Sequence, residues 1–164
     1  MPALSRSATI EAPAERVFIY VDDIRNLARH MSERGSMPVI GSKLALEIVT
    51  PEPTGVGAVY RYSGRMLGLI IAFSETVTRY VPGREKVWRT IGQPRLLIID
   101  SYEMRVLVEP IADQRSKLTI AIDYTLPRPL FWRAIGGLLA GSYAKWCLDS
   151  MIQGTVQETE GNSP

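Results

Sequence analysis

The feature that most constrains this chain is an apolar segment near its C-terminus, residues 129–148, which reads PLFWRAIGGLLAGSYAKWCL. Only Arg133 and Lys145 carry charge within it. Its spacing predicts a helix with apolar side chains on nearly all sides, whereas a helix that lies on a flat sheet needs an apolar stripe of only about 100°. Such a helix requires apolar surroundings on several sides, from a bilayer, a partner or a cavity of its own domain.

The charges in this segment disfavour a membrane span. A span needs about 20 mainly apolar residues, and each basic or acidic side chain near the bilayer centre is costly. Arg133, Lys145 and the neighbouring Asp149 would all carry that cost. The N-terminus also lacks the apolar run of a secretory signal. We therefore expect a cytoplasmic protein, which could be peripheral to a membrane.

The centre of the chain has the alternation of apolar and polar residues that is typical of β-strands. Six such runs follow one another at 43–49, 57–66, 69–81, 85–91, 96–110 and 117–127, and a short one precedes them near Leu4, Ala8 and Ile10. Short turns join the six runs, which predicts an antiparallel meander. Because each run has one apolar face, we expect a sheet covered on one side by the helix after Pro129.

Helical spacing occurs in three places. A short helix is predicted from Pro13 to Val21, since proline suits a first turn, and Asp22 and Asp23 end it. A second short helix is predicted at 24–31, and the long one is expected to end near Gln157, with a frayed polar tail after it. No repeat or linker divides the chain, so residues 1–164 are expected to form a single domain.

Three segments carry a resemblance to a known family. They are residues 10–31, 56–90 and 143–152, which read IEAPAERVFIYVDDIRNLARHM, VGAVYRYSGRMLGLIIAFSETVTRYVPGREKVWRT and YAKWCLDSMI. The chain resembles the START/Bet v 1-like (SRPBCC) superfamily of helix-grip proteins, in the branch of polyketide cyclase/dehydrase and lipid transport proteins. The resemblance implies an α+β fold, in which a curved antiparallel sheet of about seven strands wraps around a long C-terminal helix and two short helices follow the first strand. It also implies a cavity between sheet and helix, which would explain the apolar sides of the helix.

The residues expected to contact a ligand in this cavity are mainly aromatic or apolar side chains on the inward strand faces and on the long helix. They are Tyr60, Tyr62, Trp88, Asp100, Tyr102, Met104, Tyr124, Ile135, Leu139 and Trp146. Filling a core is the commoner role of such aromatic residues. Tyrosine hydroxyls in a cavity can also orient the polar head of a ligand, while the rings contact its apolar body.

No group of residues matches a known catalytic set, and Asp100, Tyr102 and His30 are the candidates if the protein is an enzyme. Asp100 shares parity with Ile98 and Tyr102, so it would face the cavity as a polar anchor or acid–base group. The alternative is that the strand begins later and Asp100 lies in a solvated turn. His30 could donate a proton or be an ordinary surface residue, and Cys147 is interpreted as a small core residue.

Composition and motifs exclude several functional classes. Hydrophobic residues make up 46%, charged residues 22%, and the net charge is +2, which is too weakly basic to imply a nucleic-acid partner. The single cysteine rules out an internal disulfide, and the single histidine rules out most zinc sites. The segment after Gly55 lacks the third glycine of a dinucleotide-binding loop. We therefore predict neither a metal nor a cofactor.

Gly136, Gly137 and Gly141 interrupt the long helix, where each costs up to about 1 kcal/mol relative to alanine. Close packing against the sheet would explain them. A bendable segment at the mouth of the cavity, able to open for a ligand, is the functional alternative.

The leading functional hypothesis is non-catalytic binding or transport of a hydrophobic small molecule, such as a lipid, an isoprenoid quinone or a polyketide. The alternative is an enzyme of the polyketide cyclase, aromatase or dehydratase type that uses the same cavity, since the resembling family includes such enzymes. A third possibility is a regulatory protein whose own side chains fill the cavity. Leu67, Leu69 and the N-terminal half of the long helix could touch membranes transiently during loading, and Arg25, Arg29 and Arg34 form a modest basic patch.

Overall fold

The computed structural model of the chain describes residues 2–29, 43–66 and 68–161. Its main element is one antiparallel sheet in the order β1-β7-β6-β5-β4-β3-β2, which confirms the predicted meander and places the first strand beside the last. The strands are β1 (Ala3–Ile10), β2 (Lys43–Ile48), β3 (Val59–Met66), β4 (Leu69–Val81), β5 (Glu85–Arg95), β6 (Ser101–Ala112) and β7 (Arg115–Thr125).

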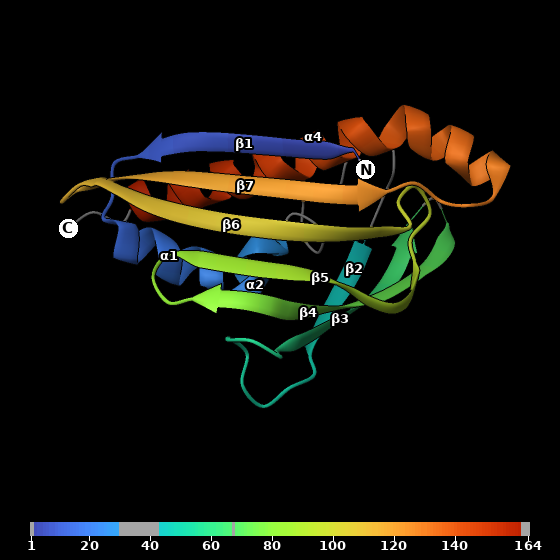
Figure 1. The fold of residues 1–164 in the computed structure, drawn as a ribbon, viewed down its shortest axis with the longest axis horizontal. Coiled ribbons are helices and arrows are strands. Elements are labelled where there is room, and N and C mark those ends of the chain that lie inside the picture. Colours follow the sequence, from blue (N-terminus) through green and yellow to red (C-terminus); the bar gives the residue numbers. More distant parts are fainter. Residues whose placement is uncertain (1, 30–42, 67, 162–164) are drawn as a thin grey trace.

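The sheet is strongly curved. In Figure 1, β2 and β3 cross steeply relative to the direction of β6 and β7. The pairing of β4 with β5 shifts register between Ala72 and Ser74 and again between Val77 and Arg79. Such β-bulges bend a strand and increase its twist. The curvature gives the sheet a concave inner face on which helices can pack.

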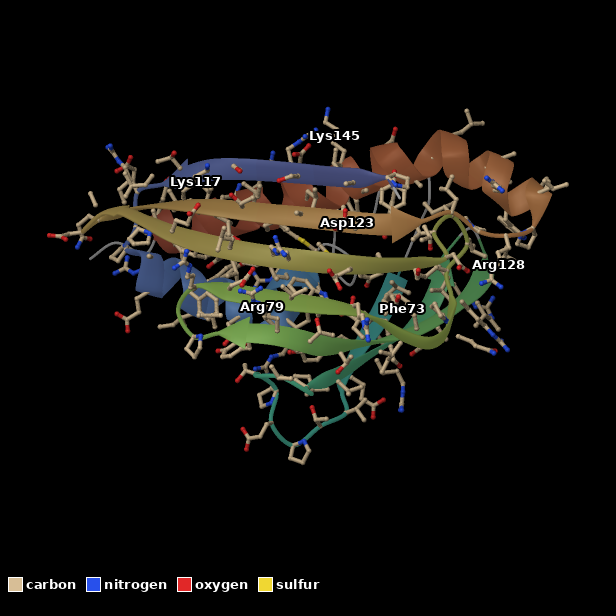
Figure 2. All side chains as sticks on the ribbon, in the orientation of Figure 1. Phe73, Arg79, Lys117, Asp123, Arg128 and Lys145 are labelled. Carbon is tan, nitrogen blue, oxygen red and sulfur yellow. The ribbon has the colours of Figure 1, made fainter. Side chains whose placement is uncertain are left out.

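The two faces of the sheet differ as the alternation predicts. Val106 of β6 and Ile120 of β7 are fully buried on the inner face. Arg79, Lys117 and Asp123 are exposed on the outer face, among the many polar side chains drawn in Figure 2. One side of the sheet therefore meets water, and the other forms the core with the helices.

Two short helices follow β1, as predicted. α1 (Ala14–Asp22) begins after Pro13 and buries Val17, Phe18 and Val21. The break falls at Asp23, whose side chain accepts a hydrogen bond from the backbone N–H of Arg25 and so caps α2 (Ile24–Leu27). α2 is shorter than the predicted segment 24–31, of which residues 30 and 31 lie outside the described residues.

The long helix α4 (Leu130–Gly161) extends beyond the predicted end near Gln157. Tertiary contacts explain the difference: the carboxylate of Glu160 accepts the backbone N–H of Glu11 at 2.9 Å, and Thr159 is buried. Polar residues after Gln157 therefore join the helix because the start of the chain packs against them. The prediction of a frayed tail was wrong for residues 158–161.

The first turns of α4 are the least enclosed part of this helix, whereas Ala140 and Ala144 farther along are buried. Leu130, Phe131 and Leu138 are 83%, 68% and 80% exposed, and this end of α4 projects beyond the sheet in Figure 1. A helix of 32 residues is about 48 Å long, whereas β6 with its 12 residues spans about 40 Å. The prediction that the helix has apolar surroundings on several sides is therefore wrong for Leu130, Phe131 and Leu138.

The helix glycines do not share one role. A Cβ atom on Gly136 would lie 2.5 Å from the carbonyl oxygen of Ile98, so Gly136 permits close packing against the segment before β6. A Cβ atom on Gly137 would meet nothing within 4 Å, and one on Gly141 would make an ordinary contact with the hydroxyl of Tyr124 at 3.7 Å. Close packing thus explains Gly136 alone.

Candidate ligand-binding cavity

A cavity of about 60 Å³ lies between the inner face of the sheet, α2 and the middle of α4. Its walls are almost entirely apolar and aromatic. The lining residues are Ile24, Leu27, Ala28, Leu44, Tyr62, Ile71, Phe73, Glu75, Trp88, Leu96, Leu97, Ile98, Ile99, Tyr102, Met104, Ile122, Tyr143, Ala144, Cys147 and Met151. A site for one water needs roughly 10–15 Å³ by a comparable measure, so this cavity has room for a few water-sized groups.

Glu75 is the one acidic side chain among the described residues of this lining. Along β4, Ile71, Phe73, Glu75 and Val77 are all buried, so the strand period turns the carboxyl group toward the core. Glu75 is only 2% exposed. The Tyr102 hydroxyl donates a hydrogen bond to its Oε1 atom, whereas its Oε2 atom is buried without a hydrogen-bond partner among the described residues.

Burial raises the pKa of Glu75 from 4.5 to about 7, because the charged form loses its solvation. Four groups oppose this effect because each stabilises the carboxylate; they are the hydrogen-bond donors of Tyr102, Tyr62 and Trp88, and the ammonium of Lys86. A carboxyl group with this pKa exchanges its proton near neutral pH. It is therefore suited both to hydrogen bonding with a ligand and to acid–base chemistry.

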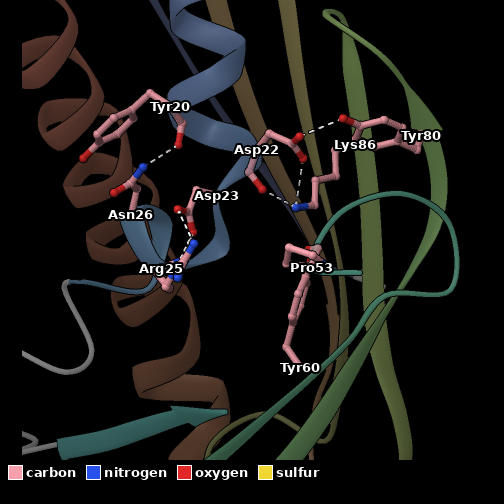
Figure 3. Close-up of polar contacts among 9 residues, drawn as sticks. All are labelled: Tyr20, Asp22, Asp23, Arg25, Asn26, Pro53, Tyr60, Tyr80 and Lys86. Carbon is pink, nitrogen blue, oxygen red and sulfur yellow. Dashed lines mark hydrogen bonds and ion pairs between the residues drawn. The ribbon is translucent and has the colours of Figure 1, made fainter. Parts of the chain in front are cut away.

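A buried lysine, Lys86, connects β5 to the end of α1 through Asp22 (Figure 3). Lys86 is 0% exposed, and its Nζ atom donates to the backbone carbonyl of Asp22 at 2.6 Å and lies 3.2 Å from Asp22 Oδ1. The Tyr80 hydroxyl donates to Asp22 Oδ2 at 2.7 Å. The ammonium also lies 5.3 Å from the ring centre of Tyr60 and 5.9 Å from that of Trp88. This network joins the end of α1 to β4 and β5.

The aromatic side chains of the cavity pack against one another. The rings of Tyr62 and Phe73 are stacked with their centres 4.6 Å apart, and Phe73 meets Tyr102 edge to face at 6.1 Å. Burial raises the pKa values of Tyr62 and Tyr102 well above 10, so both hydroxyls keep their protons. They can therefore act as hydrogen-bond donors throughout the physiological pH range.

The thiol of Cys147 also lines the cavity, from α4. Burial raises its pKa to about 12, and interaction with Tyr143 lowers it only partly. A thiol of this kind stays protonated at neutral pH and is a poor nucleophile. His30, the candidate proton donor, lies outside the described residues.

The predicted ligand contacts divide into two groups. Tyr62, Trp88, Tyr102 and Met104 line the cavity. The other predicted residues do not belong to its lining; they are Tyr60, Asp100, Tyr124, Ile135, Leu139 and Trp146.

Physical reasons separate the second group from the cavity. Asp100 precedes β6, where its backbone N–H donates to the carbonyl of Thr125, so the strand begins after it and Asp100 is not among the lining residues. The Tyr60 hydroxyl donates to the carbonyl of Pro53 at 2.6 Å. Ile135 and Leu139 lie in the N-terminal half of α4, where they pack only partly against the core.

Sequence reasoning missed Glu75 and Phe73, although a signal for both was available. Both lie in the run LIIAFSETVTRYV, at the alternating positions that place them on the same strand face as Ile71 and Val77. An acidic residue within an apolar strand face is the pattern that marks a buried functional carboxyl group. The segment 96–99, which supplies four lining residues, is predicted by the sequence to begin the strand at 96–110, but β6 begins only at Ser101, so the segment lies between β5 and β6.

The geometry of a curved sheet, a long C-terminal helix and an apolar cavity between them agrees with the sequence comparison. A family model described as polyketide cyclase / dehydrase and lipid transport matches residues 1–153. The chain belongs to this family. The resemblance to the START/Bet v 1-like superfamily and its helix-grip fold is thereby confirmed. No curated protein matches the sequence of this member.

Solved structures show the same fold at low sequence identity. TTHA0849 from Thermus thermophilus is 20% identical with a TM-score of 0.67, over 99% of this chain and 100% of that one. The Zhui aromatase/cyclase from Streptomyces sp. R1128 is 14% identical with a TM-score of 0.67, over 95% and 94%. Norcoclaurine synthase from Thalictrum flavum, in complex with dopamine and hydroxybenzaldehyde, is 14% identical with a TM-score of 0.66, over 99% and 88%.

Proposed function

We propose that this family member binds or transports a hydrophobic small molecule, such as a lipid, an isoprenoid quinone or a polyketide, without catalysing a reaction on it. The observation that carries the proposal is the apolar cavity between the sheet and α4, where Glu75 is the one acidic group among the described lining residues. Apolar burial of the ligand would supply most of the binding free energy, at about 25 cal/mol per Å². A few polar groups would set its orientation.

Loading requires the cavity to widen. Its volume of about 60 Å³ is small beside the roughly 300–1,000 Å³ of typical ligand pockets. The segment 96–99 between β5 and β6 lines the cavity and lies outside both strands, so fewer backbone hydrogen bonds hold it. We propose that this segment moves away from α4 when a ligand enters.

Native mass spectrometry and solvent extraction of the purified protein test the carrier function. We expect an apolar compound to travel with the protein, and added lipids or quinones to raise its melting temperature. An Ala144→Phe variant, which fills the cavity from α4, should lose the compound. Ala45→Phe, on the exposed face of β2, is the matched control and should keep it. An empty wild-type protein that no apolar compound stabilises would refute the proposal.

The alternative function is an enzyme of the cyclase or dehydratase type. The pKa of about 7 for Glu75 favours it, because a carboxyl group that titrates near neutrality can accept and return a proton. The structural likeness to the Zhui aromatase/cyclase also supports it. In this proposal, Glu75 removes a proton from a carbon beside a carbonyl group, and Tyr102 orients the carboxylate.

Turnover of a cyclisable polyketide separates the two functions. For an enzyme, Glu75→Gln should abolish turnover, whereas Asp100→Asn should preserve it because Asp100 does not line the cavity. Tyr102→Phe should lower turnover and shift its pH profile upward, since the Tyr102 donor lowers the pKa of Glu75. Full turnover by Glu75→Gln would exclude this mechanism.

We further propose that the protein touches anionic membranes with one end of its long axis. The exposed Leu130, Phe131 and Leu138 of α4 lie at the same end as Leu69 and Ile70, which are 45% and 65% exposed at the start of β4. Leu67 lies outside the described residues, and no helix in the described part of the chain has the length and apolar character of a membrane span. Surface contact is therefore the mode of binding that we propose.

Basic side chains at the same end suit an anionic surface. Arg65, Arg95, Arg128 and Arg133 are exposed there, with Arg128 labelled in Figure 2. None of the four pairs with a carboxylate in the described part of the chain. Each basic side chain near an anionic bilayer contributes roughly 1 kcal/mol.

The basic patch of Arg25, Arg29 and Arg34 that the sequence predicts is a poorer candidate for membrane contact. Arg25 forms an ion pair with Asp23 at 2.9 Å (Figure 3), and Arg29 pairs with Glu158 at 3.5 Å. Arg34 lies outside the described residues.

Co-sedimentation with vesicles tests the membrane surface. We expect binding to vesicles that contain phosphatidylserine and much weaker binding to phosphatidylcholine alone. Phe131→Ser should reduce the bound fraction. Ile111→Ser removes a side chain that is 53% exposed at the β6–β7 turn, at the opposite end, and should leave binding unchanged. Equal loss in both variants would refute the assignment of this end.

A further inference from the structure

Glu75 lines the cavity, and its buried Oε2 atom has no hydrogen-bond partner among the described residues. A buried polar atom without a partner is rare in folded proteins and costs roughly 1–3 kcal/mol, more if it is charged. Such an atom in the wall of an otherwise apolar cavity marks the place where a ligand can supply the missing partner.

The donors around the carboxyl group leave this position open. The Tyr102 hydroxyl donates to the other oxygen, Oε1. The ammonium of Lys86 donates to the backbone carbonyl of Asp22 and pairs with its carboxylate. Tyr62 and Trp88 stabilise the charged form of Glu75, but neither forms a hydrogen bond with Oε2. The missing donor must therefore come from outside the described residues.

We infer that the cavity recognises an aromatic or fused-ring molecule that carries a neutral hydroxyl group, and that this hydroxyl donates a hydrogen bond to Oε2 of Glu75. The inference rests on the proposed binding function and narrows its ligand class. It favours phenols and ring alcohols over compounds that offer only acceptors, such as quinones or ethers.

Charge and shape support this choice over other head groups. A carboxylate or phosphate would be repelled by the charged form of Glu75, whereas an ammonium would be attracted by Glu75 and repelled by Lys86, which is close enough to lower the pKa of Glu75. Loss of solvation would add to the cost of either charge in this cavity. The stacked pair of Tyr62 and Phe73 and the edge contact of Phe73 with Tyr102 present ring surfaces suited to a flat ligand.

A matched pair of probes tests the inference. 2-Naphthol has a hydroxyl donor, and 2-methoxynaphthalene has the same ring with an acceptor only. We expect isothermal titration calorimetry at about pH 8, above the pKa of Glu75, to show 2-naphthol binding roughly tenfold to a hundredfold more tightly, as expected for a hydrogen bond to a charged group.

The ratio of the affinity for 2-naphthol to the affinity for 2-methoxynaphthalene should depend on Glu75. In Glu75→Gln the amide nitrogen can replace Oε2, so the ratio should fall to one or below. In Glu75→Leu, which offers neither donor nor acceptor, it should fall to about one. Glu109→Gln changes a carboxyl group on the opposite face of β6 and should keep the wild-type ratio.

The outcomes separate this inference from the proposed function. Equal binding of both probes by the wild-type protein would overturn the hydroxyl preference and leave the hydrophobic carrier intact. Tight binding of 2-naphthol that survives in Glu75→Gln would overturn the role of Glu75. Failure of both probes and of every other apolar compound to bind would refute the carrier function and the inference together. Since the wild-type comparison needs no variant, it decides the question even if a substitution prevents folding.

Discussion

The raised pKa of Glu75 makes protein stability depend on pH in a defined direction. Folding moves this pKa from 4.5 to about 7 because the carboxyl group is buried. The folded protein therefore holds the proton more tightly than the unfolded chain does. Its stabilising effect is fully present below pH 4.5 and is lost as the pH rises through about 7.

The size of this effect follows from the change in pKa. The difference between 4.5 and about 7 is about 2.5, and one pKa unit corresponds to about 1.36 kcal/mol. The wild-type protein should therefore lose about 3 kcal/mol of unfolding free energy through Glu75 over this pH range. Tyr62 and Tyr102, which face the carboxyl group, stay protonated throughout because burial raises their pKa values.

The assay compares the wild-type protein with Glu75→Gln, whose amide does not titrate. Urea unfolding followed by tryptophan fluorescence between about pH 4 and about pH 8 gives the unfolding free energy of each. The variant minus wild-type difference should rise by about 3 kcal/mol across the range, because the contributions of groups that do not interact with Glu75 cancel. Glu109→Gln should show no such rise. A difference for Glu75→Gln that stays constant with pH would refute the reasoning.

Two further predictions concern packing and charge. Gly136→Ala should destabilise the protein by roughly 1–3 kcal/mol in urea unfolding, because its Cβ atom would lie 2.5 Å from the carbonyl oxygen of Ile98. Gly137→Ala, whose Cβ atom would meet nothing within 4 Å, should be neutral or stabilise by up to about 1 kcal/mol. Equal effects of the two substitutions would contradict the packing role of Gly136. Lys86→Met should cost roughly 3–5 kcal/mol by the same measurement, since it leaves the half-buried carboxylate of Asp22 without its cation. Adding Asp22→Asn should recover part of this loss, and no recovery would argue against the ion pair as its source.

Glu75 shows where sequence reasoning stops. Its inward direction follows from the period of β4, but the groups that set its chemistry come from other strands. Tyr62 lies on β3, Trp88 and Lys86 on β5, and Tyr102 on β6. Whether these donors reach one carboxyl oxygen or both depends on register and curvature, which a one-dimensional pattern does not contain.

The sequence by itself determined the strand periods, the break at Asp22 and Asp23, and the presence of one long apolar helix, because each depends on neighbours within a few residues. Tertiary structure decided that Thr159 and Glu160 join α4, that Leu130 and its neighbours project from the sheet, and that one oxygen of Glu75 stays without a partner among the described residues. These features depend on contacts between segments that are far apart in the chain. Burial and the distances between charged groups, which set a pKa and an exposed surface, exist only once those segments have packed together.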